Sequence, residues 1–310
     1  MHSEILSTEQ LALRGHTKQS IRRACAHGEL VRLRPGRYRP AIPTDRLVPA
    51  AWPEGEAERR HLQLLSAALP LAAGTVASHL SAGVLHGLPV PHEELQRITT
   101  LRGGSGHGTR RDTRWTRRAR LPTSDVTTVQ GIPVTTLART VADLARTLPF
   151  PDAVAVADAA LRRGSETAED ARLRFLEQLR HRQSGNALAR RALVFADFRA
   201  ESPGESRCRA SFALAGVPIP QLQYEVYADG RLLGRADFAW PEQRLLGEYD
   251  GIGKYDALVG GDTARAIRQE KAREGRIFQL GWNTIRFTHT DLQDLAALRI
   301  RVLDALDRSR

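Results

Sequence analysis

Three acidic residues near the C-terminus have the types and spacing of a divalent-metal site. Glu248 and Asp250 are two residues apart on an expected strand, so both side chains leave the same face of the sheet. A tight hairpin before this strand places Asp237 opposite Leu246 and diagonal to Glu248, at roughly 7–8 Å between backbones. Carboxylates this close repel one another, so the pattern indicates a bound cation, and oxygen ligands favour Mg²⁺ or Mn²⁺. Such a metal activates water and polarises a phosphoryl oxygen, which predicts phosphodiester hydrolysis.

The elements that position these acids have the expected order α-β-β-β-α-β-α. Asp229-Gly230 is a hairpin signal between the first two strands, and a Pro-Gly start marks the first helix. The expected helices cover residues 203–215, 263–280 and about 290 onward, and the expected strands cover residues 221–227, 231–240, 244–250 and 283–287.

Asp237, ten intervening residues and then Glu248-x-Asp250 resemble the PD-(D/E)xK nuclease superfamily. Residues 201–305 are similar to endonuclease-like domains related to very-short-patch repair endonuclease, through these segments: Ala236-Asp-Phe-Ala-Trp-Pro241, Gly247-Glu-Tyr-Asp-Gly-Ile-Gly-Lys-Tyr255 and Glu270-Lys-Ala-Arg-Glu274. The resemblance implies that Asp237 and Glu248 are metal ligands, with Asp250 beside them. It also implies that Glu205, in the first turn of the first helix, is an accessory acid.

Asp250 stands where the superfamily has a lysine, so an active enzyme needs another cation. Lys254 follows on the loop after the same strand, and Lys271 lies on the next helix. Lysine or Arg273 would stabilise charge on the pentavalent phosphorus. The alternative is that Glu248 and Asp250 are solvated acids on an inactive scaffold.

The positive charge lies in the first two thirds of the chain. The 310 residues include 46 Lys and Arg against 35 Asp and Glu, a net charge of +11. Residues 201–310 contain equal numbers of both signs, so the excess lies in residues 1–200, clustered in residues 1–40 and 97–120. This clustering indicates a polyanionic partner, and double-stranded DNA is the leading candidate, with RNA as an alternative.

The first basic block predicts a winged helix-turn-helix over residues 1–50. A capping box at Ser7 begins one helix, Thr17 begins a second, and two short strands flank a Pro-Gly turn. The second helix would lie in the major groove, and the strands would contact phosphates. The expected DNA contacts are Lys18, Gln19, Arg22 and Arg23 on the helix and Arg32, Arg34 and Arg37 on the wing. The alternative is a helical cap with a solvated basic surface.

A basic middle domain is expected over residues 51–198. The glycine-rich stretch Arg102–Gly108 does not have the spacing of a phosphate-binding loop. We interpret it as a flexible hairpin tip that touches nucleic acid, with a solvated loop as the alternative. Arg110, Arg111 and Arg114 are the expected contacts. His79 and His86 are two helical turns apart, too far for two ligands of one ion.

The front of the chain also resembles a family, over about residues 5–165. Its motifs include Arg14-Gly-His-Thr17, Ser78-His-Leu-Ser-Ala-Gly-Val-Leu-His-Gly-Leu88 and Gly131-Ile-Pro-Val-Thr-Thr-Leu. They look like the AbiEi-type antitoxins of abortive-infection systems, which resemble repressors with an N-terminal winged helix. The resemblance implies a cognate toxin or self-association.

The expected fold is therefore a multidomain α+β or α/β chain. It has a winged helix-turn-helix (1–50), a mixed middle domain (51–198) and an αβββαβ restriction-endonuclease-like domain (199–310). Two cysteines and the lack of a long apolar run predict a cytoplasmic protein without a membrane span. The leading hypothesis is a Mg²⁺- or Mn²⁺-dependent DNA endonuclease. The alternative is a non-enzymatic DNA-binding regulator of the antitoxin type.

Overall fold

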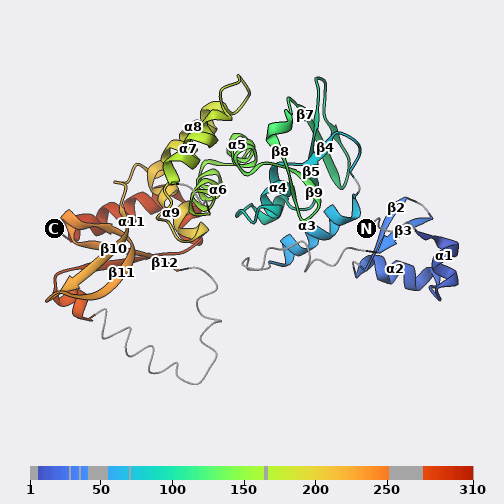
Figure 1. The fold of residues 1–310 in the computed structure, drawn as a ribbon. Helices are drawn as coiled ribbons and strands as arrows, with labels where there is room; N and C mark the ends of the chain where they lie inside the picture. Colours follow the sequence, from blue (N-terminus) through green and yellow to red (C-terminus); the bar gives the residue numbers. More distant parts are fainter. Residues whose placement is uncertain are drawn as a thin grey trace. The chain divides into compact units, whose positions relative to one another are not determined.

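The chain folds as a mixed α/β protein with more than one compact unit. The computed structural model describes residues 6–27, 29–34, 36–40, 55–69, 71–163, 167–250 and 275–309. Two units are distinguished, residues 1–144 and 145–310, and Figure 1 shows their elements. The mixed multidomain expectation therefore agrees with the structure, whereas the division at residues 50 and 198 stays a prediction.

The first unit begins with two short helices and a three-stranded sheet. Ser7 forms the expected capping box at the start of the first helix, and Thr17, where the second helix was expected to begin, forms a capping box as well. The helices are α1 (Thr8–Leu13) and α2 (Lys18–Ala26), and the strands, in the order β1-β3-β2, are β1 (Leu6–Ser7), β3 (Arg37–Pro40) and β2 (Leu30–Arg34). The small core between them consists of Leu6, Leu11, Ile21, Ala24 and Leu30.

A six-stranded sheet forms the larger part of the first unit. Its strand order is β6-β7-β5-β4-β9-β8, with β5 and β7 parallel. The strands are β4 (Thr75–Ala77), β5 (Ile98–Gly103), β6 (Thr109–Arg110), β7 (Arg114–Ala119), β8 (Val126–Val129) and β9 (Ile132–Thr135). The accompanying helices are α3 (Glu56–Ala67), α4 (His79–Leu85) and α5 (Leu137–Thr147), the last of which crosses the division between the units.

A buried ion network joins α5 to the loop before β8. The Arg139 guanidinium lies 2.7 Å from the Asp125 carboxylate and 2.9 Å from that of Asp143. Burial by itself lowers the pKa of Arg139, but the two carboxylates outweigh it and raise the pKa above its ordinary value. The charge on Arg139 is therefore neutralised inside the unit.

The second unit starts with four helices. These are α6 (Phe150–Arg162), α7 (Ala168–Glu177), α8 (Asn186–Phe195) and α9 (Pro203–Ala215). The Asp158 carboxylate on α6 and the Arg209 guanidinium on α9 are 3.0 Å apart, with side chains 0% and 4% exposed. This buried pair binds α6 to α9 within the unit.

The four-stranded sheet β10-β11-β12-β13 follows, and it is antiparallel except for the parallel pair β12 and β13. The strands are β10 (Gln221–Ala228), β11 (Arg231–Trp240), β12 (Leu245–Tyr249) and β13 (Asn283–Phe287), and α11 (Leu295–Arg308) closes the chain. Phe212 of α9 packs edge to face against Phe238 and Phe287, with ring centroids 5.4 and 5.0 Å away. This aromatic cluster lies in the hydrophobic core of the second unit.

The register of β11 against β12 differs from our expectation. Ala239, and not Asp237, lies opposite Leu246. The reason is the length of the turn: residues 241–243 form a 3₁₀ turn and Arg244 adopts a φ of 49°, so the loop is longer than the expected tight hairpin. Continuing the observed register by one residue brings Asp237 level with Glu248.

Candidate functional site

The basic side chains expected on the second helix all point to solvent. Ile21 and Ala24 face the small core of the first unit, which fixes the rotation of α2. The exposed residues are Lys18, Gln19, Arg22 and Arg23. Among the described residues no carboxylate pairs with Lys18, Arg22 or Arg23. We call this surface the α2 face.

The expected wing contacts are described only in part. Arg32 is exposed on β2, and its partner across the antiparallel pair of β2 and β3 is Tyr38. Arg34 and Arg37 belong to the same two strands, but their side chains lie outside the described residues. One of the three expected wing contacts is therefore available for solvent or a ligand.

The second basic block surrounds a tryptophan that the sequence interpretation did not use. Arg110 and Arg111 are exposed and Arg114 is half-buried. The Arg117 guanidinium stacks on the Trp115 ring, 3.7 Å from its centroid, and that of Arg110 lies 5.4 Å away. Burial lowers the pKa of Arg117. Trp115 stands two residues before Arg117 on β7, so the two side chains leave the same face of the strand, and this spacing could have indicated the stack.

His79 and His86 each make a hydrogen-bond contact within the first unit. The Nε2 atom of His86 lies 2.7 Å from the Thr135 carbonyl oxygen. His79 is buried, and its Nδ1 atom lies 3.2 Å from the Ser78 hydroxyl.

The structure places Asp237 and Glu248 at neighbouring positions of the second unit. Phe238 of β11 lies opposite Gly247 of β12, and continuing this register by one residue brings Asp237 level with Glu248. An Asp237 carboxylate oxygen accepts a hydrogen bond from the Tyr249 backbone N–H at 2.8 Å. The carboxylate of Asp237 is thus held at the sheet by the backbone of the neighbouring strand.

Arg286 is the cation beside these acids. It pairs in register with Glu248 across the parallel strands β12 and β13. Its guanidinium nitrogens lie 3.9 Å from an oxygen of Glu248 and 3.9 Å from an oxygen of Asp250, whose side chains are 22% and 27% exposed. We call Glu248, Asp250 and Arg286 the acid–arginine cluster. The three cations expected near the acids, Lys254, Lys271 and Arg273, lie outside the described residues.

The predicted three-carboxylate metal site is not assembled in the part of the chain that the structure describes. No three His, Cys, Asp or Glu side chains there form a group suited to a metal ion. Glu205 is buried at the start of α9, where its carboxylate accepts hydrogen bonds from the Glu201 backbone N–H at 2.9 Å and the Gln223 amide at 2.8 Å. Asp237 and Glu248 are both hard oxygen donors, the ligand type that Mg²⁺ prefers, and their role as metal ligands stays a prediction. The nuclease roles of these residues stay predictions.

The comparisons with known proteins place the front of the chain in a family. The model of the AbiEi antitoxin C-terminal domain matches residues 18–193, more than half of the chain, and the chain belongs to this family. The matched range includes the α2 face and the six-stranded sheet, and it ends before the acid–arginine cluster.

Two curated proteins of Mycobacterium tuberculosis, from strains CDC 1551 and H37Rv, are similar to this chain. Each is 36% identical to it over 183 residues, which is 59% of this chain. The match spans 65% of the length of these relatives, both of which carry the name uncharacterized protein.

None of the described helices is both long enough and apolar enough to cross a bilayer.

Proposed function

We propose that the chain is a DNA-binding regulator of the antitoxin type, with α2 as the element that enters the major groove. Membership of the AbiEi antitoxin C-terminal domain family supports a role in a toxin–antitoxin system. The observation that carries the DNA-binding part is the α2 face, which presents three cations and one amide without carboxylate partners among the described residues. Unpaired positive charge on one helix face is the electrostatic footprint of a nucleic-acid interface.

The local structure of α2 supports a recognition helix. Its first turn is fixed by the Thr17 capping box, and Lys18 and Gln19 follow directly. Residues near the N-terminus of a recognition helix reach base edges, and the Gln amide is suited to adenine. Arg22 and Arg23 follow one turn later, where guanidinium groups contact phosphates or guanine. Arg32 on β2 would act as a wing contact.

A cognate toxin belongs to the same proposal. The chain would regulate the expression of that toxin by binding DNA near the genes of both proteins. Co-expression of the full chain with a candidate toxin tests this part, with rescue of growth as the expected result. Continued growth arrest would exclude an antitoxin role.

Fluorescence anisotropy with a labelled duplex from the upstream region of the protein's own gene tests the DNA-binding part. Removing one guanidinium contact costs about 1.5–3 kcal/mol, so Arg22→Gln and Arg23→Gln should each weaken binding about tenfold or more. Arg60→Gln is the matched control, because Arg60 is exposed on α3 and its substitution removes the same positive charge. Equal affinities for all variants would overturn the assignment of the α2 face.

A second candidate function is phosphodiester hydrolysis in the second unit. Two observations support it: Asp237 and Glu248 take neighbouring positions, and β12 pairs in parallel with β13 after an antiparallel β10-β11-β12. A Mg²⁺ or Mn²⁺ held by Asp237 and Glu248 would polarise a phosphoryl oxygen and acidify a bound water. The Tyr249 N–H would hold Asp237 in place, and Arg286 would face the negative charge of the phosphate.

Supercoiled plasmid with Mg²⁺ or Mn²⁺ tests this candidate. Asp237→Asn keeps an oxygen for the Tyr249 hydrogen bond but removes the charge, so it should abolish cleavage without unfolding the sheet. Glu242→Gln is the matched control, since Glu242 is exposed in the turn before β12. Absence of cleavage by the wild type on duplex, single-stranded and RNA substrates would leave the regulator as the function of the whole chain.

A further inference from the structure

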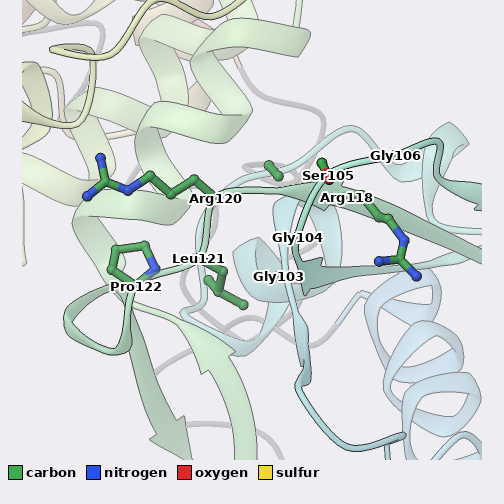
Figure 2. A pocket seen from close by; sticks show the side chains of 9 residues that line it. Gly103, Gly104, Ser105, Gly106, Arg118, Arg120, Leu121 and Pro122 are labelled. Carbon is green, nitrogen blue, oxygen red and sulfur yellow. The ribbon is translucent and has the colours of Figure 1, made fainter.

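An open hollow lies at the carboxyl ends of the parallel strands β5 and β7 (Figure 2). Its volume is about 660 Å³, within the range of roughly 300–1,000 Å³ that is usual for small-molecule sites. The lining comes from the two segments that leave these strands: Gly103, Gly104, Ser105, Gly106, Arg118, Ala119, Arg120, Leu121 and Pro122. The carboxyl ends of parallel strands are a common place for ligands in α/β sheets.

The glycine-rich segment in this hollow has a defined conformation that depends on its glycines. Gly104 and Gly106 have φ angles of 117° and 111°, which other residues rarely adopt. A Cβ atom on Gly104 would lie 3.4 Å from a guanidinium nitrogen of Arg118. The Arg118 guanidinium and the backbone of Gly104 are therefore close neighbours. Peptide groups and a guanidinium gathered in one place are suited to an anion.

The charge next to this loop is not balanced by the chain. Arg102 on β5 and Arg118 on β7 are direct partners in the parallel register. Like charges on adjacent strands repel, and both side chains are exposed. In the part of the chain that is described, no carboxylate pairs with Arg102 or Arg118. A bound phosphate would relieve this repulsion.

One wall of the hollow is apolar. Leu121 and Pro122 form it, as Figure 2 shows. Ala119 also belongs to the lining of the hollow. A phosphodiester backbone alone does not need an apolar wall, whereas a base or another flat group attached to a phosphate does. We propose that the hollow binds a nucleoside phosphate, with the phosphate at Arg118 and the Gly103–Gly106 segment and the base against Leu121 and Pro122. This site is independent of the α2 face and gives the chain a means of responding to a small ligand.

Isothermal titration of the full chain with ATP, GTP, CTP, UTP and inorganic pyrophosphate tests the proposal. At least one nucleotide should bind more tightly than pyrophosphate, and Arg118→Gln should weaken that binding about tenfold or more. Arg60→Gln should bind like the wild type, because it loses an exposed arginine elsewhere in the same unit. Thermal unfolding of each variant shows whether it is folded. If Arg118→Gln is not folded, Arg118→Lys provides the second test, because it keeps the positive charge but removes the guanidinium, and nucleotide binding should still weaken.

Three results would overturn the proposal. The first is that no nucleotide binds at millimolar concentration. The second is that pyrophosphate binds as tightly as every nucleotide, which would leave the apolar wall without a role. The third is that Arg118→Gln weakens duplex DNA binding but leaves nucleotide binding unchanged, which would assign Arg118 to the DNA backbone.

Discussion

The α2 face and the acid–arginine cluster are both strongly charged, but they differ in how that charge is neutralised. On the α2 face, Lys18, Arg22 and Arg23 are exposed and unpaired among the described residues. In the acid–arginine cluster, Arg286 lies within 3.9 Å of both Glu248 and Asp250. The first surface requires an anion from outside the chain, whereas the second already holds ions of both signs.

The buried ion pairs extend this comparison. Asp158 with Arg209, and Arg139 with Asp125 and Asp143, are neutralised inside their own units. Such groups stabilise the fold only while both partners are present. Charge that the chain neutralises itself is therefore a structural feature, and charge that it leaves exposed on one face indicates a partner.

Removal of one member of a buried pair should have the largest effect on stability. Arg209→Met leaves Asp158 buried without its guanidinium, and we expect a loss of about 3–5 kcal/mol in the free energy of unfolding. Urea denaturation measures this loss. The double variant Asp158→Asn with Arg209→Met should recover part of it, because no unpaired charge remains. A loss under about 1 kcal/mol for the single variant would contradict the role of the pair.

A change in the acid–arginine cluster should affect metal affinity more than stability. Arg286→Gln removes the cation beside Glu248 and Asp250, so Mn²⁺ from solution should bind about tenfold more tightly than to the wild type. The stability change should be small, since the side chains are partly exposed and screened. Calorimetric titration with Mn²⁺ gives the metal affinity of the wild type and of Arg286→Gln. Equal affinities would show that Arg286 does not neutralise Glu248 and Asp250.

His61 adds a buried group that stays uncharged. Burial lowers the pKa of His61, and its ring nitrogens lie 2.8 Å from the Leu95 carbonyl oxygen and 2.9 Å from the Ser81 hydroxyl. The carbonyl can only accept, so Nδ1 carries the proton and Nε2 accepts from Ser81.

This lowered pKa makes stability depend on pH. The contribution of His61 to stability is fully present when the pH is above about 6.5, the pKa of histidine in the unfolded chain. This contribution decreases as the pH falls below that value, by up to about 1.4 kcal/mol per pH unit. Unfolding measured between pH 7 and pH 5 should therefore show a shallower decrease for His61→Gln than for the wild type. Identical slopes would mean that His61 does not contribute to the acid dependence.

The smallest stability effect is expected on the α2 face. Arg22→Gln and Arg23→Gln remove side chains without partners among the described residues, so thermal unfolding should change by no more than about 0.5 kcal/mol. A larger loss would show that these arginines help to hold the fold and would weaken their assignment to DNA.

Local signals predicted most of the elements. The capping box at Ser7, the helix start at Thr17, the Asp229-Gly230 hairpin and the exposed side of α2 follow from residues close in sequence. The register of β11 against β12 could not be predicted in this way, because the sequence does not reveal that Pro241–Gln243 form a 3₁₀ turn.

Contacts between distant segments were the other part that the sequence did not reveal. Arg286 meets Glu248 only because β12 and β13 are parallel, and that pairing joins segments that are far apart in the chain. Asp158 and Arg209 are likewise paired by the packing of α6 against α9. Spacing rules apply within an element and give no partner across such distances.

The salt dependence of duplex DNA affinity tests the central claim most directly. Each phosphate contact contributes about 0.9 to the slope of log affinity against log salt, so the double variant Arg22→Gln with Arg23→Gln should reduce the slope by up to about two. Arg60→Gln should leave it unchanged. Equal slopes for the wild type and the double variant would contradict the assignment of the α2 face as the DNA interface.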